Sequence, residues 1–187
     1  MINHQHQFIF VHIPKTAGKS VQRFFGAPWH PHKDLPRYAA ALEPSVFDRY
    51  YKFTIIRNPW DRILSDYNFQ IRKRTSAGKR LCAHNGNGEI PNFREWLEAV
   101  FSNPYRYSPA DWGGCVSQRI HRWSPQVDWI SMDGRVAVDG ILRMDNLRED
   151  FEKLCRTLNL PCRQLPCRNW QFHWHYHRIF PPPWPKP

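Results

Sequence analysis

Residues 8–25 constrain the fold of this chain more than any other stretch. They read FIFVH, then IPKTAGKS, then VQRFF: an apolar run rich in aromatic and β-branched residues, a glycine-containing loop, and a segment with the apolar spacing of a helix. We expect a buried strand over residues 8–12 and a helix over residues 20–25. A strand, a tight loop and a helix N-terminus create an anion site, because backbone N–H groups and the positive end of the helix dipole point outward there.

The side chains of this loop are suited to a phosphate or a sulfate. Lysines supply cations, hydroxyl groups supply hydrogen-bond donors, and glycine lets the backbone approach an anion closely. The candidate binding residues are Lys15, Thr16, Ala17, Gly18, Lys19 and Ser20. The phosphate loop of NTP hydrolases reads G-x-x-x-x-G-K-[ST], and its first glycine would fall at Ile13 here. The loop therefore departs from the ATP-binding pattern.

A second anion site is predicted at the end of the next strand. The run KFTII over residues 52–56 is strand-like, and Arg57 follows it where an ATPase would place an acidic residue to hold magnesium. An arginine cannot bind a metal ion but pairs well with a phosphate. Ser65 comes eight residues later, about two turns along the helix predicted from Pro59, and adds a hydroxyl. The second site therefore favours a phosphate without a metal, which disfavours ATP with magnesium.

Strand-like and helix-like segments alternate along the rest of the chain, which predicts an α/β fold with a central parallel sheet and flanking helices. Further strands are expected over residues 127–130, 135–138 and 140–144, and further helices over residues 37–42, 45–50, 59–71, 93–101, 116–123 and 146–158. We expect a single domain over residues 1–180 and a proline-rich tail over residues 181–187.

Three segments together resemble the sulfotransferase superfamily: IPKTAGKS at 13–20, FTIIRNPWDRILSDY at 53–67 and GILRMDNLREDF at 140–151. The ordered motifs make the likeness specific. More narrowly, the chain is similar to the small carbohydrate-type, sulfotransferase family 2-like enzymes, which use 3'-phosphoadenosine 5'-phosphosulfate (PAPS). The resemblance implies a nucleotide-kinase-like sulfotransferase fold. Lys19 stands where the family usually has threonine, and Met144 and Asp145 replace its usual phenylalanine and glutamate.

The resemblance also implies roles for the motif residues. The first motif would cradle the 5'-phosphosulfate of PAPS, while Arg57 and Ser65 would hold its 3'-phosphate. Lys15 would neutralise the leaving phosphate oxygen, so that no metal is required. The family normally continues through a tyrosine-rich segment into a final helix, where this chain has PPPWPKP. That departure leaves a catalytically degenerate nucleotide-binding relic as an alternative.

The acceptor hydroxyl needs a general base, and histidine is the natural choice near neutral pH. His32 matches the position of a histidine in bacterial members of the family. His30, in the same loop, stays an alternative. His84 and His121 are further alternatives, because related enzymes draw their base from between the second and third motifs. His12, at the end of the first strand, is expected to be structural.

Composition limits the partners. Lys and Arg number 27 against 16 Asp and Glu, a formal charge of +11, which favours anionic ligands. The basic residues form no dense arm, so we expect no nucleic acid as partner. No run approaches the roughly 20 apolar residues of a membrane span and no leader precedes the first strand, which predicts a cytoplasmic protein. The five cysteines lack paired C-x-x-C spacing, which argues against a disulfide framework and a structural zinc site. His173, His175 and His177 are expected to hold no functional metal.

The motifs and the family resemblance that they carry imply a PAPS-dependent sulfotransferase that moves a sulfuryl group to a free hydroxyl of a glycan or similar small-molecule acceptor. The catalytic candidates are Lys15 and His32. An ATP- and magnesium-dependent small-molecule kinase is the other enzyme alternative, and Ile13 speaks against it. The acceptor itself stays open, with the irregular stretches 26–36, 75–92 and 103–114 as candidate acceptor loops.

Overall fold

The protein is described here by a computed structural model covering residues 1–28, 30–72, 91–102, 123–161 and 165–166. Its centre is a four-stranded sheet in the order β1-β2-β3-β6. The strands are β1 (Ile2–Asn3), β2 (Phe8–Val11), β3 (Tyr51–Ile56) and β6 (Gly140–Arg143). β2, β3 and β6 are parallel, and β1 pairs antiparallel with β2 at the edge. The predicted α/β fold with a central parallel sheet is confirmed.

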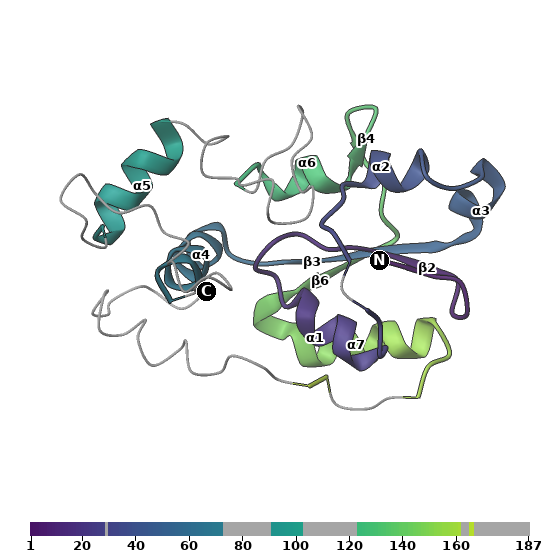
Figure 1. Ribbon diagram of the computed structural model, residues 1–187. Helices are drawn as coiled ribbons and strands as arrows, with labels where there is room; N and C mark the ends of the chain where they lie inside the picture. Colours follow the sequence, from purple (N-terminus) through teal and green to yellow (C-terminus); the bar gives the residue numbers. More distant parts are fainter. Residues whose placement is uncertain (29, 73–90, 103–122, 162–164, 167–187) are drawn as a thin grey trace.

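Helices cover both faces of this sheet (Figure 1). They are α1 (Gly18–Phe24), α2 (Leu35–Ala39), α3 (Pro44–Arg49), α4 (Pro59–Arg72), α5 (Phe93–Ser102), α6 (Gln126–Ile130) and α7 (Leu147–Thr157), with a 3-10 turn over Met144–Asn146 before α7. α1 and α7 lie on one face, and α2, α3 and α6 lie on the other. A separate two-stranded ribbon joins β4 (Ser131–Met132) to β5 (Arg135–Val136).

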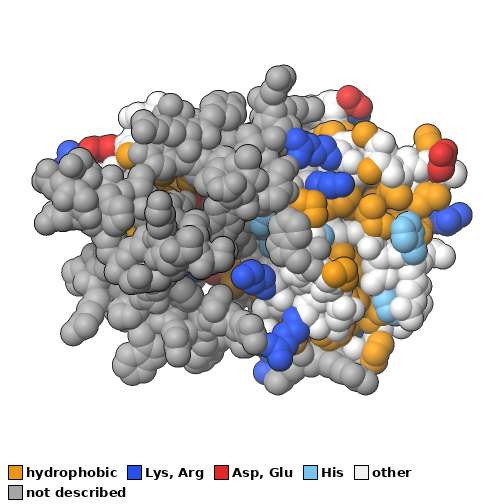
Figure 2. Space-filling view, viewed as in Figure 1, with side chains coloured by type: hydrophobic (Ala, Val, Ile, Leu, Met, Phe, Trp, Pro, Cys, Tyr) orange, Lys and Arg blue, Asp and Glu red, His pale blue; other side chains and the backbone are white. Residues whose placement is uncertain are grey.

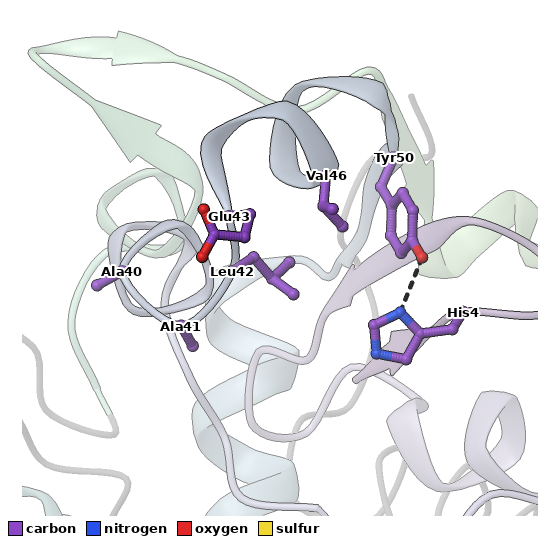
Figure 3. A pocket seen from close by; sticks show the side chains of 7 residues that line it. All are labelled: His4, Ala40, Ala41, Leu42, Glu43, Val46 and Tyr50. Carbon is purple, nitrogen blue, oxygen red and sulfur yellow. Dashed lines mark hydrogen bonds between the residues drawn. The ribbon is translucent and has the colours of Figure 1, made fainter.

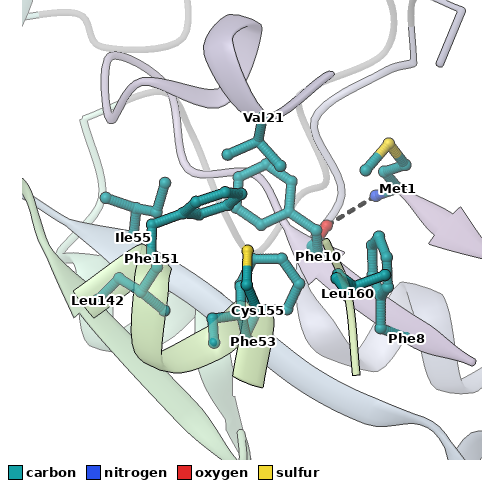
Figure 4. Close-up of a cluster of buried hydrophobic side chains, with 11 residues drawn as sticks. Met1, Phe8, Phe10, Val21, Phe53, Ile55, Leu142, Phe151, Cys155 and Leu160 are labelled. Atoms are coloured by element: carbon teal, nitrogen blue, oxygen red, sulfur yellow. Dashed lines mark hydrogen bonds between the residues drawn. The ribbon is translucent and has the colours of Figure 1, made fainter. Parts of the chain in front are cut away.

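The alternation of side chains along the strands separates two buried clusters, one on each face of the sheet. Phe8 and Phe10 of β2 point toward α1 and α7, where they meet Val21 and Phe151 (Figure 4). Ile9 and Val11 point the other way, toward α2 and Trp129 of α6. All four β2 side chains are fully buried, which is why the strand reads as a continuous apolar run.

A third cluster lies between α4 and α5. Its buried members are Leu64, Tyr67, Trp96, Val100 and Trp123. α4 also buries polar side chains in this region. The carboxylate of Asp66 accepts a hydrogen bond from Trp123 Nε1 at 2.9 Å and one from Gln70 Nε2 at 3.2 Å. The bond from Trp123 fixes this residue against α4, so the helix is held by directional contacts as well as by apolar packing.

The sequence prediction fails at a few elements. Residues 127–130 form part of helix α6 and not a strand, because Pro125 begins a helix here and only one side is buried: Ile130 is 3% exposed and Val127 is 49% exposed. The strand expected over 135–138 ends at Val136. The short strands β1 and β4 were not expected, since neither has an apolar run of its own.

Several predictions fall where the structure describes no residues. They are the helix over 116–123 except for Trp123, which lies in a turn, most of loop 75–92, the loop over 103–114 and the tail over 181–187. In the described part of the chain, no helix combines the length and apolar character that crossing a bilayer requires.

Candidate functional site

The loop between β2 and α1 is tightly wound. Lys15 and Ala17 both have left-handed backbone conformations, with φ of 70° and 61°. Such angles cost a residue with a Cβ about 1–2 kcal/mol, and they cluster at functional sites. The hydroxyl of Thr16 donates to the Ile13 carbonyl at 2.8 Å, and the Ser20 N–H donates to the Ala17 carbonyl at 2.8 Å. In this arrangement the Thr16 hydroxyl is hydrogen-bonded within the loop itself.

Gly18 is required by the ring of His12. A Cβ built on Gly18 would lie 1.9 Å from His12 Nε2, a separation that no side chain tolerates. His12 is 7% exposed and stacks on Phe10, with 5.6 Å between ring centroids. The glycine therefore permits close packing of the His12 ring against the loop.

The second motif meets the first at the carboxyl ends of β2 and β3. The two strands pair in parallel with Val11 opposite Thr54, so the residues that follow each strand emerge at the same edge of the sheet. The guanidinium of Arg57 donates to the carbonyl of Lys15 at 3.4 Å, the long end of the hydrogen-bonding range. Arg57 thus lies beside the loop, although the two residues are 42 positions apart.

An aromatic side chain of α4, that of Phe69, lies beside the lysines of the loop. The Lys15 ammonium lies 4.0 Å from the centroid of the Phe69 ring, and the Lys19 ammonium lies 6.0 Å from it. Ser65 precedes Phe69 by one helical turn, so both residues occupy the same side of α4. That side faces the loop. The sequence did not single out Phe69, although its four-residue spacing from Ser65 was a usable signal.

Three histidines gather behind the loop. The ring centroid of His12 lies 4.1 Å from that of His32 and 5.3 Å from that of His30. Nδ1 of His32 is 2.9 Å from the His12 carbonyl oxygen. A carbonyl oxygen only accepts, so Nδ1 carries the proton and Nε2 is the basic nitrogen of the neutral ring. Burial lowers the pKa of His30 to about 4, which makes this histidine a weak base.

The remaining candidates for the base, His84 and His121, lie outside the described residues. Where residues are described, no group of three His, Cys, Asp or Glu side chains is arranged to hold a metal ion. On the face of the molecule shown in Figure 2, Lys and Arg side chains gather near the centre of the view, and most of the visible Asp and Glu lie toward the rim.

One residue that contacts the site was missed by the sequence analysis. Gln126, at the start of α6, accepts a hydrogen bond from the Arg57 N–H at 2.9 Å and donates one to the Arg57 carbonyl at 2.7 Å. Its position after Pro125 marked a helix start, but no local pattern connects it to Arg57.

A pocket elsewhere on the protein is separate from this site. A shallow hollow of about 440 Å³ is lined by His4, Tyr50, Leu42, Glu43, Val46, Ala40 and Ala41 (Figure 3). His4 Nδ1 and the Tyr50 hydroxyl are hydrogen-bonded at 2.8 Å. Tyr50 precedes β3 and Arg57 follows it, so the hollow lies at the opposite end of the sheet from the loop.

The whole sequence was compared with curated proteins, solved structures and protein families. No curated protein and no solved structure gives a match to this chain. The sequence pattern of the sulfotransferase family, in contrast, matches residues 1–177, which include the loop, Arg57, α4 and Gln126. The chain belongs to the sulfotransferase family.

Proposed function

We propose that this chain transfers the sulfuryl group of PAPS to a hydroxyl of a saccharide or similar small acceptor. The observation that carries the proposal is the meeting of the two anion-binding motifs. The Arg57 guanidinium reaches the carbonyl of Lys15, and the Lys15 ammonium reaches across to Phe69 of α4. Arginine, lysines and backbone N–H groups therefore share one edge of the sheet, in a chain of the sulfotransferase family.

The donor groups at this edge fit PAPS. The loop, with Lys15, Lys19 and the α1 N-terminus, suits the 5'-phosphosulfate, and Arg57 with Ser65 suits the 3'-phosphate. The residue that follows β3 is an arginine, so the carboxylate that would hold magnesium beside ATP is replaced by a cation. The set of side chains thus favours two anionic groups over a metal–nucleotide complex.

Bound PAPS would supply the sulfuryl group and a bisphosphate leaving group. The protein's part is positioning and electrostatics, as in phosphoryl transfer. The Lys15 ammonium would neutralise negative charge on the leaving oxygen. Nε2 of His32 would accept the proton of the acceptor hydroxyl, because the bond from Nδ1 to the His12 carbonyl leaves Nε2 as the basic nitrogen. His12 would orient the base through its backbone carbonyl.

Calorimetric titration with adenosine 3',5'-bisphosphate, the desulfated product, tests the donor site. We expect binding in the presence of a chelator, weakened strongly in Arg57→Ala and Lys15→Ala. The matched control is Arg49→Ala, which removes an exposed arginine that lies before β3 and away from the loop.

A second titration, with magnesium and ATP, separates the alternatives. Binding of magnesium–ATP together with no binding of the bisphosphate would contradict the proposal and support a kinase. Binding of the bisphosphate without transfer to any saccharide tested would support a nucleotide-binding relic of the family.

A further inference from the structure

The backbone N–H and carbonyl of Arg57 are hydrogen-bonded to a side chain, that of Gln126, and not to a neighbouring strand. The ladder between β3 and β6 ends at the pair Ile56–Arg143, one residue before Arg57. The Gln126 side-chain amide hydrogen-bonds to both backbone polar groups of Arg57: it accepts from the N–H at 2.9 Å and donates to the carbonyl at 2.7 Å. Since an N–H only donates and a carbonyl only accepts, the partners also fix which way round the amide lies.

Gln126 is itself anchored by the residues before it. The carbonyl of Ser124 accepts a hydrogen bond from Arg62 Nη2 at 2.9 Å, and Trp123 Nε1 donates to Asp66 Oδ2 at 2.9 Å. Ser124, Trp123, Arg62 and Asp66 are all buried. Arg62 and Asp66 lie on α4 on either side of Ser65 in the sequence, so residues 123–126 brace the helix that carries Ser65 as well as the strand end that carries Arg57.

We propose that Gln126 is a positioning residue for the arginine that binds the 3'-phosphate of PAPS, an inference that rests on the proposed donor site. Its amide holds the Arg57 peptide at the end of β3, and this sets the point from which the guanidinium reaches the loop. The role is indirect: Gln126 contacts the Arg57 backbone and needs no contact with the nucleotide. A preorganised guanidinium loses less freedom on binding, so its phosphate contact is stronger.

The test uses two nucleotides that differ only in the 3'-phosphate. Gln126→Met keeps the length of the side chain and removes both hydrogen bonds. We expect it to weaken binding of adenosine 3',5'-bisphosphate about tenfold, the loss typical of one misaligned charge-assisted hydrogen bond. Binding of adenosine 5'-phosphate, which lacks the 3'-phosphate, should stay unchanged. The matched control is Ser131→Ala, which removes a hydrogen bond at the other end of α6.

The effect should also depend on Arg57. In an Arg57→Ala background, Gln126→Met should have no further effect on bisphosphate binding, because the group that it positions is gone. Gln126→Glu is a second variant, in which one oxygen still accepts from the Arg57 N–H while the other faces the Arg57 carbonyl. It should weaken bisphosphate binding selectively too, and it replaces Gln126→Met if that variant does not fold.

The outcomes separate this inference from the donor site. If the wild type binds the bisphosphate and both Gln126 variants bind it equally well, the positioning role is wrong and the donor site stands. Equal weakening of both nucleotides would also contradict the role, because it would show a general structural effect. A wild type that binds neither nucleotide would overturn the donor site and this inference together.

Discussion

At the scale of single residues, the loop between β2 and α1 depends on one close contact. The ring of His12 occupies the space where a Gly18 side chain would lie, and the carbonyl of His12 holds His32. One residue thus connects the backbone of the loop after β2 to the candidate base. The burial of His12 agrees with the expectation that this residue is structural. Its contacts with Gly18 and His32 make it a structural residue of the candidate site.

Gly18→Ala should disrupt the loop. The new Cβ would lie 1.9 Å from His12 Nε2, so the ring or the loop must move, at a cost of about 1–3 kcal/mol in the free energy of unfolding. Denaturant unfolding measures the cost, and bisphosphate titration measures the accompanying loss of binding. Gly26→Ala is the comparison: its Cβ meets nothing within 4 Å, so its cost comes from the positive φ of 58°, a backbone conformation that Gly18 does not have.

The clash between a Gly18 side chain and the His12 ring can be tested by removing the ring. The double variant Gly18→Ala, His12→Ala removes the ring that the new methyl group would strike. It should be less destabilised than the sum of the two single variants. Strictly additive losses would show that the contact is not the reason for the glycine.

His32→Asn should abolish most turnover and leave donor binding intact. The asparagine amide can still donate to the His12 carbonyl, but it has no basic nitrogen. Loss of a general base costs about 10²–10⁴-fold in rate. Transfer of labelled sulfuryl from PAPS to a saccharide acceptor measures the rate, and bisphosphate calorimetry measures binding. His30→Asn should retain activity, since burial lowers the pKa of His30 to about 4; a larger loss in His30→Asn would reverse the assignment.

At the scale of elements, the junction between β6 and α7 is held by a charge pair. The Asp150 carboxylate accepts hydrogen bonds from the backbone N–H and Nε of Arg143, at 2.9 and 3.1 Å, and from Asn146 Nδ2 at 3.1 Å. The third sequence motif, GILRMDNLREDF, thus joins the last parallel strand to the helix that covers the buried cluster beside β2.

This junction should weaken in acid. Hydrogen bonds from Arg143 lower the pKa of Asp150 from 3.8 to about 2 in the folded protein. A lowered folded-state pKa adds stability that is present above the unfolded pKa and is lost as the pH falls through the folded one. The free energy of unfolding should therefore fall between about pH 4 and pH 2. Asp150→Asn should flatten this part of the profile, and an unchanged slope would show that other carboxylates cause it.

At the scale of the whole molecule, the candidate site joins parts of the chain that are distant in sequence. The loop after β2, the arginine after β3, one side of α4 and the start of α6 meet at the carboxyl edge of the sheet. A ligand that contacts several of them stabilises the whole fold, because it binds the folded state and not the unfolded chain.

Adenosine 3',5'-bisphosphate at one hundred times its dissociation constant should therefore raise the free energy of unfolding by about 2.7 kcal/mol. Thermal and denaturant unfolding with chelator present measure the gain. Arg57→Ala at the same ligand concentration should gain much less. An equal gain in the variant would place the nucleotide elsewhere on the protein.

Much of this architecture was predictable, and particular residues show where prediction ends. The apolar runs at β2 and β3 and the proline that begins α4 mark their elements locally, so these were predicted to within a residue or two. Val127 and Ile130 have strand propensity, yet they lie in α6 because tertiary packing buries one side of that segment and Gln126 bonds to Arg57. Local propensity is a weak signal wherever such contacts compete with it.

The sequence by itself determined the α/β class and the places of β2, β3 and α4, and it supplied the candidate anion-binding groups, because periodicity and motif spacing are properties of neighbouring residues. Only the tertiary structure decided what those groups contact. It brought Arg57 to the Lys15 carbonyl, placed Phe69 beneath the lysines, turned the Thr16 hydroxyl inward and joined Gln126 to the Arg57 peptide. These contacts link residues far apart in the chain, and their geometry follows from the pairing of parallel strands and the packing of α4 and α6, which no local pattern encodes.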